Sequence, residues 1–311
     1  MATWGLSATI LAPAQDILRF AAHHIELGAH RLYIYLDDDN RAAFDALKPH
    51  PKVRVQICDD THWFRLGGKR PEKHQVRQTR NATHAYARRT EVDWLIHMDV
   101  DEFLVPDTPV DDMLSALDAG ATSARVRPME LLGGSDDAYK AFIPASGQRS
   151  KIVNSLYPTF GPYLTGGFLS HVAGKLFVRT GLPDVTVRIH NAFQGKTMMP
   201  DAVELPHIAL AHRHAASWSA WRAAYAYRLE KGSYRAELKP ATRPEDGGQT
   251  LHDLFRQLYD DKGEDGLRTF YDEVVDDSAA LRARLDAQGL LRIAPLDLDG
   301  AVAKHFPETA V

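Results

Sequence analysis

The sequence predicts an α/β protein with a mostly parallel central sheet, and three observations carry this prediction. Short apolar runs alternate with helical patterns through the first hundred residues. Acidic residues follow several of these runs, where the carboxyl ends of parallel strands would meet. The chain has 311 residues, of which 44% are hydrophobic and 25% charged, as in a globular protein of one large domain or two. Strands interleaved with helices favour a parallel sheet covered by helices.

The elements of the expected sheet can be placed in order along the chain. Strands are expected at 6–11, 31–36, 53–57 and 93–98. Helices are expected between them at 14–28, 41–47 and 72–91, the first ending at Gly28 as its C-cap. A helix at 110–119 and strands at 122–130, 175–178 and 185–190 follow. The segment 133–170 is rich in Gly, Ser, Pro and aromatic residues, which indicates long loops over a site.

The last third of the chain is expected to be mostly helical. Trp218, Trp221, Tyr225 and Leu229 are spaced as one face of a helix, and amphipathic segments occur around 251–260 and 278–289. We therefore divide the chain into a domain at 1–235 and a helical C-terminal extension at 236–311. Within the first domain, residues 1–105 and 106–235 are interpreted as two halves.

Composition excludes several classes of protein. A formal charge of −4 argues against a general nucleic-acid binder, which needs a basic face. No segment approaches the roughly 18 apolar residues of a membrane span, and no signal peptide is evident at the N-terminus. Cys58 is the one cysteine, so an internal disulfide is impossible. We interpret Cys58 as a core residue and expect a cytoplasmic protein.

The most informative stretch is the acidic turn after the run Trp94-Leu95-Ile96-His97-Met98. It reads Asp99-Val100-Asp101-Glu102. A buried carboxylate costs several kcal/mol unless a partner offsets it, so carboxylates at the end of a buried strand indicate a ligand. Residues i and i+2 of an extended chain point the same way, and Asp99 and Asp101 can face one ligand together. A divalent cation that carries phosphate oxygens fits best.

With its flanking residues, this stretch resembles glycosyltransferases of the GT-A fold, specifically a family-2-like bacterial group with an Asp-x-Asp motif. The resemblance spans about residues 6–235. It rests on the runs at 20–28, 33–37 and 93–104, on Gly174–Arg179 leading to Ile189-His190, and on Ala211–Ser217. It implies a Rossmann-like, mostly parallel sheet and transfer of a sugar from a nucleotide diphosphate. An Asn-Glu pair usual in the group is replaced here by Ala12-Pro13-Ala14-Gln15-Asp16.

The resemblance also implies roles for residues around the acidic turn. Asp101 is the expected direct ligand of Mn²⁺ or Mg²⁺, with Asp99 nearer the ribose or reaching the metal through water. Asp37 would meet the nucleotide base or ribose, because a carboxylate accepts hydrogen bonds from ring N–H and hydroxyl groups. One face of the helix before the turn would present three further residues to the donor: Arg77, Gln78 and Asn81.

The remaining expected roles leave alternatives open. A histidine completes the metal site in this fold, and His212 fits best because it lies five residues before Ser217; His190 and His214 are the alternatives. Inverting transfer needs a general base, and the carboxylates after the fifth strand are Glu130, Asp136 and Asp137. We favour Asp136 or Asp137 because the glycines before them allow a close approach to a sugar.

The sequence therefore predicts a metal-dependent, inverting glycosyltransferase of cell-surface or exopolysaccharide biosynthesis. Its partners would be a nucleotide-sugar donor and a glycan or other hydroxyl acceptor, and not nucleic acid. Peripheral contact with a membrane-bound assembly at the inner face of the membrane, and an oligomer formed through the C-terminal helices, are kept as further hypotheses. The alternatives are a nucleotidyltransferase or phosphoesterase, and a non-catalytic nucleotide-sugar-binding protein.

Overall fold

The computed structural model describes residues 1–88, 91–199, 203–241 and 248–309. The chain forms two compact units that alternate along the sequence. The first unit contains Met1–Arg127, Ala173–Leu210 and Asp297–Val311, and the second contains Pro128–Val172 and Ala211–Leu296. The domain boundary at residue 235, inferred from the sequence, stays a prediction. The two compact units are defined by packing, whereas that boundary was meant to separate functional domains.

The first unit is built on a sheet whose centre is parallel. β1 (Trp4–Ile10), β2 (Arg31–Leu36), β3 (Val53–Ile57) and β4 (Trp94–His97) lie in the order β3-β2-β1-β4, with every neighbouring pair parallel. The sheet continues through β8 (Lys175–Arg179) and the first residues of β6 (Ser123–Leu131), which pair antiparallel. The predicted fold class, a mostly parallel sheet flanked by helices, is confirmed.

The strand order creates a switch point between β1 and β4. The connections through α1 (Ala14–Glu26) and α2 (Arg41–Leu47) lead from β1 to β2 to β3, whereas α4 (His74–Ala87) returns the chain past β1 to β4. Because such crossovers are right-handed, α4 covers the sheet face opposite α1 and α2. In parallel sheets, ligands bind beyond the carboxyl ends of the strands where the order reverses. The end of β4 is therefore a favourable place for a site.

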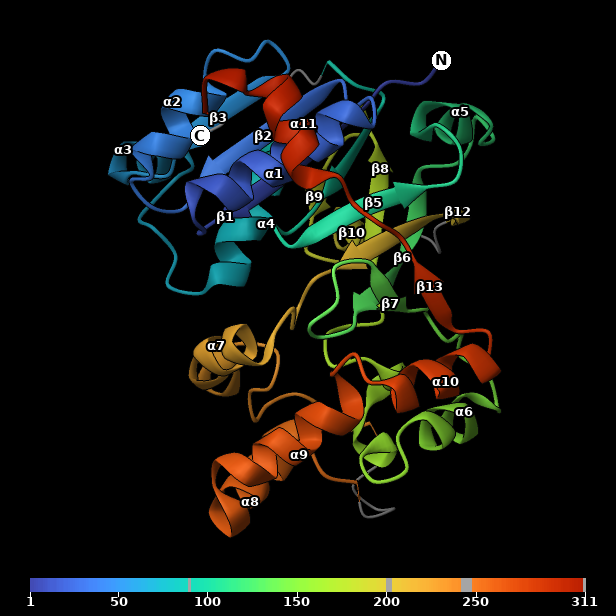
Figure 1. Ribbon diagram of the computed structural model, residues 1–311. Helices are drawn as coiled ribbons and strands as arrows, with labels where there is room; N and C mark the ends of the chain where they lie inside the picture. The colour runs from blue at the N-terminus through green and yellow to red at the C-terminus, as the bar shows by residue number, and fades with distance from the viewer. Residues whose placement is uncertain (89–90, 200–202, 242–247, 310–311) are drawn as a thin grey trace. The chain divides into compact units, whose positions relative to one another are not determined.

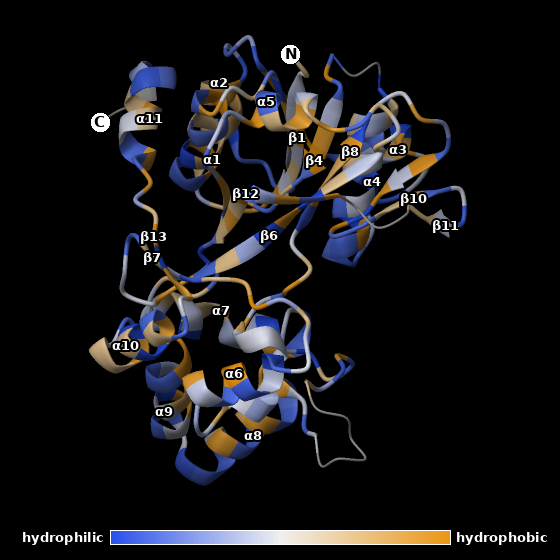
Figure 2. Ribbon diagram, turned by 90° about the vertical axis from the view of Figure 1, so that its right-hand side faces the viewer, coloured by the Kyte–Doolittle hydropathy of each residue, from blue (hydrophilic) through white to orange (hydrophobic). Residues whose placement is uncertain are grey.

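Apolar side chains explain why these strands form the centre of the unit. All seven residues of β1 and all four of β4 are buried. Figure 2 shows hydrophobic residues along the strands of this unit. One core cluster lies between the sheet and α4 and includes Trp63, Tyr86, Leu95 and Val178. On the other face, α11 (Leu298–His305) packs along α1 (Figure 1).

Several elements of the first unit were not anticipated. They are α3 (Asp60–Arg65), β5 (Glu102–Pro106), β10 (Ala192–Gln194), β11 (Thr197–Met198), β12 (Val203–His212) and α11. The anticipated α5 is shorter, at Val110–Ser115, and the last anticipated strand is β9 (Val185–Val187). Asp59 is the N-cap of α3, because its carboxylate accepts a hydrogen bond from the backbone N–H of His62 at 2.8 Å. This capping bond accounts for one of the acidic residues that follow β3.

The second unit is mainly helical and has its own core. Its helices are α6 (Arg149–Leu156), α7 (Trp218–Glu230), α8 (Leu251–Lys262), α9 (Glu264–Val274) and α10 (Ala279–Ala287). β13 (Leu291–Ile293), β7 (Ala138–Lys140) and the end of β6 pair antiparallel. The expectation of long loops at 133–170 is wrong where β7 and α6 form, because Val153 and Leu156 on α6 are buried in the core of this unit. Within the described residues, no helix combines the length and apolar character needed to cross a bilayer.

Candidate functional site

The acidic turn after β4 is closed by two reciprocal hydrogen bonds. The carboxylate of Glu102 accepts from the backbone N–H of Asp99 at 2.8 Å. The backbone N–H of Glu102 in turn donates to the carbonyl of Asp99 at 3.1 Å. Buried Met98 precedes the turn, and Phe103 and Leu104 after it are buried as well. Apolar anchors on both sides thus hold the acidic residues at the carboxyl end of β4, beside the switch point.

Both oxygens of the Asp99 carboxylate accept hydrogen bonds within the first unit. Lys175 at the start of β8 donates from Nζ to Oδ2 at 2.6 Å, and the side-chain amide of Gln78 on α4 donates to Oδ1. Burial opposes ionisation of Asp99, but the ammonium of Lys175 outweighs it and holds the pKa of Asp99 far below its usual value. Asp99 is therefore a fixed negative charge whose direction is set by α4 and β8.

Asp101 lies two residues further along the same turn and is half-buried. Its carboxylate is an oxygen donor of the kind that Mn²⁺ and Mg²⁺ prefer, and half-burial leaves it accessible to a cation. The donor set of the turn therefore fits a hard divalent cation. Direct binding by Asp101, and any share that Asp99 has in it, remain predictions.

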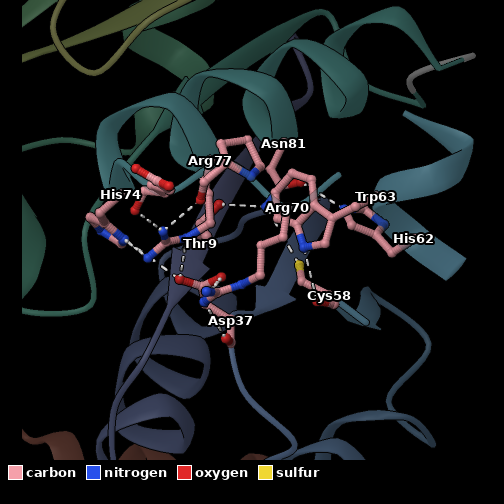
Figure 3. Close-up of polar contacts among 11 residues, drawn as sticks. Thr9, Asp37, Cys58, His62, Trp63, Arg70, His74, Arg77 and Asn81 are labelled. Atoms are coloured by element: carbon pink, nitrogen blue, oxygen red, sulfur yellow. Dashed lines mark hydrogen bonds and ion pairs between the residues drawn. The ribbon is translucent and has the colours of Figure 1, made fainter. Parts of the chain in front are cut away.

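Asp37, at the carboxyl end of β2, is a buried carboxylate at the centre of a second charge cluster (Figure 3). Arg77 donates from Nε to Oδ2 at 2.7 Å, and Arg70 donates from Nη2 to Oδ1 at 3.0 Å. Nδ1 of His74 lies 3.7 Å from Oδ2. Burial opposes ionisation, yet the contact with His74 and the charge of Arg77 hold the pKa of Asp37 below its usual value. The predicted contact of Asp37 with a nucleotide stays a prediction.

The three helix residues predicted to share a face do lie together, buried on α4. Arg77 contacts Asp37 and Gln78 contacts Asp99, so two of them hold carboxylates that follow strands. Asn81 donates to Oγ1 of Thr9 on β1 at 3.0 Å, and its Oδ1 is 2.8 Å from Nε2 of His62. Their contacts with a donor nucleotide stay predictions. The face of α4 connects the two carboxylate clusters through one buried polar layer.

Four residues of these clusters had no role predicted from the sequence: His62, Arg70, His74 and Lys175. Lys175 offered a signal, because it is a charged residue that opens the apolar strand Lys175-Leu176-Phe177-Val178 and is fully buried. Cys58, by contrast, is the core residue it was expected to be. Burial raises the pKa of its thiol to about 12, which leaves it unreactive at neutral pH.

In the second unit, the three candidate bases have different surroundings. Glu130 is buried, paired with Lys140 at 2.7 Å, and accepts hydrogen bonds from the backbone N–H groups of Leu169 and Ser170. Burial opposes its ionisation, but the charge of Lys140 prevails and holds the pKa of Glu130 well below its usual value. Such a carboxylate is a poor base, because a proton it accepted would disrupt a buried ion pair.

The other two candidates are accessible. The carboxylate of Asp136 is exposed, and one oxygen lies 3.9 Å from Nη2 of Arg213. Asp137 is half-buried and accepts a hydrogen bond from the hydroxyl of Ser135 at 3.3 Å. The role of base remains a prediction for each of the three.

The second unit also gathers imidazoles. The ring centroid of His212 lies 5.2 Å from that of His214 and 5.4 Å from that of His171. In each of these two pairs, ring nitrogens come within 4.8 Å of one another, a spacing that suits a shared metal ion. His171 was not among the histidines predicted. His190 lies instead in the first unit, where its Nδ1 is 3.1 Å from the carbonyl of Gly174.

Comparison with known proteins gives fold likenesses of low similarity. No family model and no curated protein matches the chain. Among solved structures, HddC from Yersinia pseudotuberculosis has 10% identity and a TM-score of 0.36, covering 68% of this chain and 90% of that one. The 4-diphosphocytidyl-2C-methyl-D-erythritol synthase from Anaerococcus prevotii has 9% identity and a TM-score of 0.26, covering 46% and 60%. The galactosyltransferase LgtC with donor and acceptor sugar analogues has 11% identity and a TM-score of 0.26, covering 56% and 57%. At such TM-scores these likenesses carry no argument about function.

Proposed function

We propose that this chain is a metal-dependent glycosyltransferase of the GT-A type, which moves a sugar from a nucleoside diphosphate to a hydroxyl acceptor. The observation that carries the proposal is the position of Asp99 and Asp101. They follow β4 at the switch point of a parallel sheet, with Asp37 at the carboxyl end of β2, two strands away. Ligands of such sheets bind at this edge, and carboxylates there suit a cation with phosphates.

The chain's own residues would divide the work of binding the donor. A bound divalent cation would supply Lewis-acid neutralisation of the charge that grows on the departing diphosphate. Asp101 would hold this cation. Asp99, fixed by Lys175 and Gln78, would accept hydrogen bonds from the ribose. The guanidinium groups of Arg70 and Arg77, which both pair with Asp37 at the end of β2, would also be able to bind a phosphate of the donor.

Activation of the acceptor would fall to a carboxylate of the second unit. Asp136 or Asp137 would take the proton from the acceptor hydroxyl as the sugar carbon is attacked from the side opposite the leaving group. Glu130 would instead be structural, since its buried pair with Lys140 fixes the backbone at Leu169 and Ser170. His212 stays the predicted histidine ligand of the cation.

The decisive experiment compares Asp101→Ala with Asp107→Ala. Asp107 is an exposed carboxylate just after β5, so its removal changes the net charge equally without touching the turn. We expect Asp101→Ala to lower sugar transfer at least about 100-fold, because it removes electrostatic stabilisation of the leaving group. The melting temperature should stay equal or rise, because clustered negative charge is lost. Transfer would be measured with a panel of nucleotide sugars and acceptors, with and without Mn²⁺.

The same assay separates the alternatives. A nucleotidyltransferase would release pyrophosphate from a nucleoside triphosphate, and a binding protein would bind nucleotide sugars without turnover. Failure of every nucleotide sugar to bind by calorimetry with Mn²⁺ present would exclude the proposal. A large loss of stability in Asp101→Ala would show that the turn is structural.

A further inference from the structure

A lysine on the neighbouring strand β8 supplies a positive charge to the acidic turn. Lys175 is fully buried, and its ammonium lies 2.6 Å from Oδ2 of Asp99 and 3.0 Å from Oε2 of Glu102. The side chain of Glu102 is also fully buried, whereas that of Asp99 is 30% exposed. One ammonium thus bridges two carboxylates of the turn from the neighbouring strand, and solvent reaches only one of the two.

This arrangement exceeds what folding alone requires. A buried lysine is costly, and replacing all members of a buried ion pair by apolar residues that fill the same space is often neutral or stabilising. The strand Lys175-Leu176-Phe177-Val178 is otherwise apolar and buried, so an apolar residue would suit its first position. The ammonium is therefore best explained by what it does to the carboxylates.

We propose that Lys175 is the permanent counter-ion of the acidic turn, and that it keeps Asp99 from chelating a metal ion. Oδ2 of Asp99 is bound to Lys175 and Oδ1 to Gln78, so both oxygens of this carboxylate are occupied, and the proposed function assigns the cation to Asp101. One carboxylate and the predicted His212 fill only part of the coordination sphere of a hard divalent cation, and phosphate oxygens would have to supply the other ligands. The cation would then bind together with the diphosphate, so the free protein would hold little metal.

Lys175 acts in this account as a positioning residue, through Asp99 and Glu102. The inference deepens the proposed function and rests on it for the role of the diphosphate. The part of the inference that does not depend on the diphosphate is that Lys175 suppresses metal binding by the turn when no nucleotide is bound. This part can be tested with the metal alone.

The test uses Lys175→Met, which keeps the length of the side chain and removes its charge. Glu102, which is fully buried, and Asp99, which is 30% exposed, then lose their counter-ion, and the melting temperature should fall by about 10 °C. Millimolar MnCl₂ without nucleotide should restore at least half of this loss, because Asp99 is open to solvent and free to chelate. Wild-type protein should respond little to MnCl₂ alone. Electron paramagnetic resonance of free Mn²⁺ should show at least about tenfold tighter binding by the variant.

Lys140→Met is the matched control. Lys140 is equally buried and pairs with Glu130 at 2.7 Å, so its loss should destabilise the protein to a similar degree. The side chain of Glu130 is only 3% exposed, and Mn²⁺ should not restore this variant. Equal responses of the two variants to Mn²⁺ would overturn the proposal, because they would show a general effect of unpaired buried charge.

A double variant keeps the proposal testable if Lys175→Met does not fold. Lys175→Met with Glu102→Gln removes one positive and one negative charge, so the net charge of the cluster is unchanged. Freed Asp99 should still raise the affinity for Mn²⁺ above that of wild type, and unchanged affinity would overturn the proposal. Tighter Mn²⁺ binding in a protein that binds no nucleotide sugar would leave the counter-ion role intact and exclude the proposed function.

Discussion

Arg77 decides whether the carboxylate at the end of β2 can remain ionised inside the protein. It donates to Asp37 from Nε and to the carbonyls of Pro71 and Glu72 from Nη1, at 2.9 and 2.6 Å. Arg77→Met would leave a buried charge partly compensated by Arg70, whose side chain is 43% exposed. We expect a loss of about 3 kcal/mol in the free energy of unfolding by denaturant. Exposed Arg80 on the same helix provides the control. Arg80→Met should change the free energy of unfolding by less than about 0.5 kcal/mol.

The effect of Arg77→Met should depend on pH in one direction. The pKa of Asp37 is lowered in the folded state, so the stabilisation is fully present above the unfolded value of about 3.9. It is lost as the pH falls through the folded pKa, and the difference between wild type and variant should shrink there. A difference that persists unchanged in acid would mean that Arg77 acts through its backbone contacts alone.

The sequence located the carboxylates of the site but not their partners. Asp37 and Asp99 could be placed at strand ends because apolar runs mark the strands and side-chain direction follows from the extended chain. Lys175 lies 76 residues from Asp99 in the sequence, and no local pattern links the two. Pairings across that distance depend on the strand order, which places β8 beside β4. The sequence of neither strand predicts this order.

At the level of elements, the approach of β8 to β6 depends on Gly174. Its φ is +69°, and a Cβ there would lie 2.0 Å from the carbonyl oxygen of Val126. Gly181, at the other end of β8, has φ +82° and open space around a Cβ. Gly181→Ala should therefore cost only the conformational strain, about 1–2 kcal/mol. Gly174→Ala should cost more, about 4 kcal/mol, because β8 must also move away from β6.

Denaturant unfolding of both variants measures this difference. Since Lys175 follows Gly174 directly, displacement of β8 should also weaken the hold on Asp99. The Gly174 variant should then bind Mn²⁺ more tightly than the Gly181 variant. Equal losses of stability would show that the close contact relaxes at no cost.

Strands and helices were predictable where periodicity and turn residues agreed. β2, α2 and β3 were predicted with the bounds that the structure has, because Asp37 follows β2, Lys48-Pro49 follows α2 and Cys58-Asp59 follows β3. α3 has only six residues, which are too few to show a helical periodicity in the sequence. Its one sequence signal was Asp59, a residue type that is common at the N-cap of a helix. α6 was missed because Val153 and Leu156 are its only buried residues and Gly, Ser and Pro surround them.

For the whole molecule, the two units should respond differently to a donor. The acidic turn, Asp37 and Lys175 all belong to the first unit, whereas the aromatic core around Trp221, Phe255 and Phe270 belongs to the second. A nucleoside diphosphate with Mn²⁺, at about 100 times its dissociation constant, should stabilise the state it binds by about 2.7 kcal/mol. The melting temperature should rise by about 5–10 °C, with little change for Mn²⁺ alone because Lys175 occupies Asp99.

Hydrogen exchange read by mass spectrometry can locate this stabilisation. Backbone amides at the carboxyl ends of β1, β2 and β4 and along α4 should gain protection, because these segments surround the carboxylates. Amides of α8 and α9 pack in the second core and should exchange as before. A panel of nucleoside diphosphates would identify the preferred base, because the diphosphate with that base should raise the melting temperature most. Protection confined to α8 and α9 would place the ligand in the second unit and contradict a donor site at the end of β4.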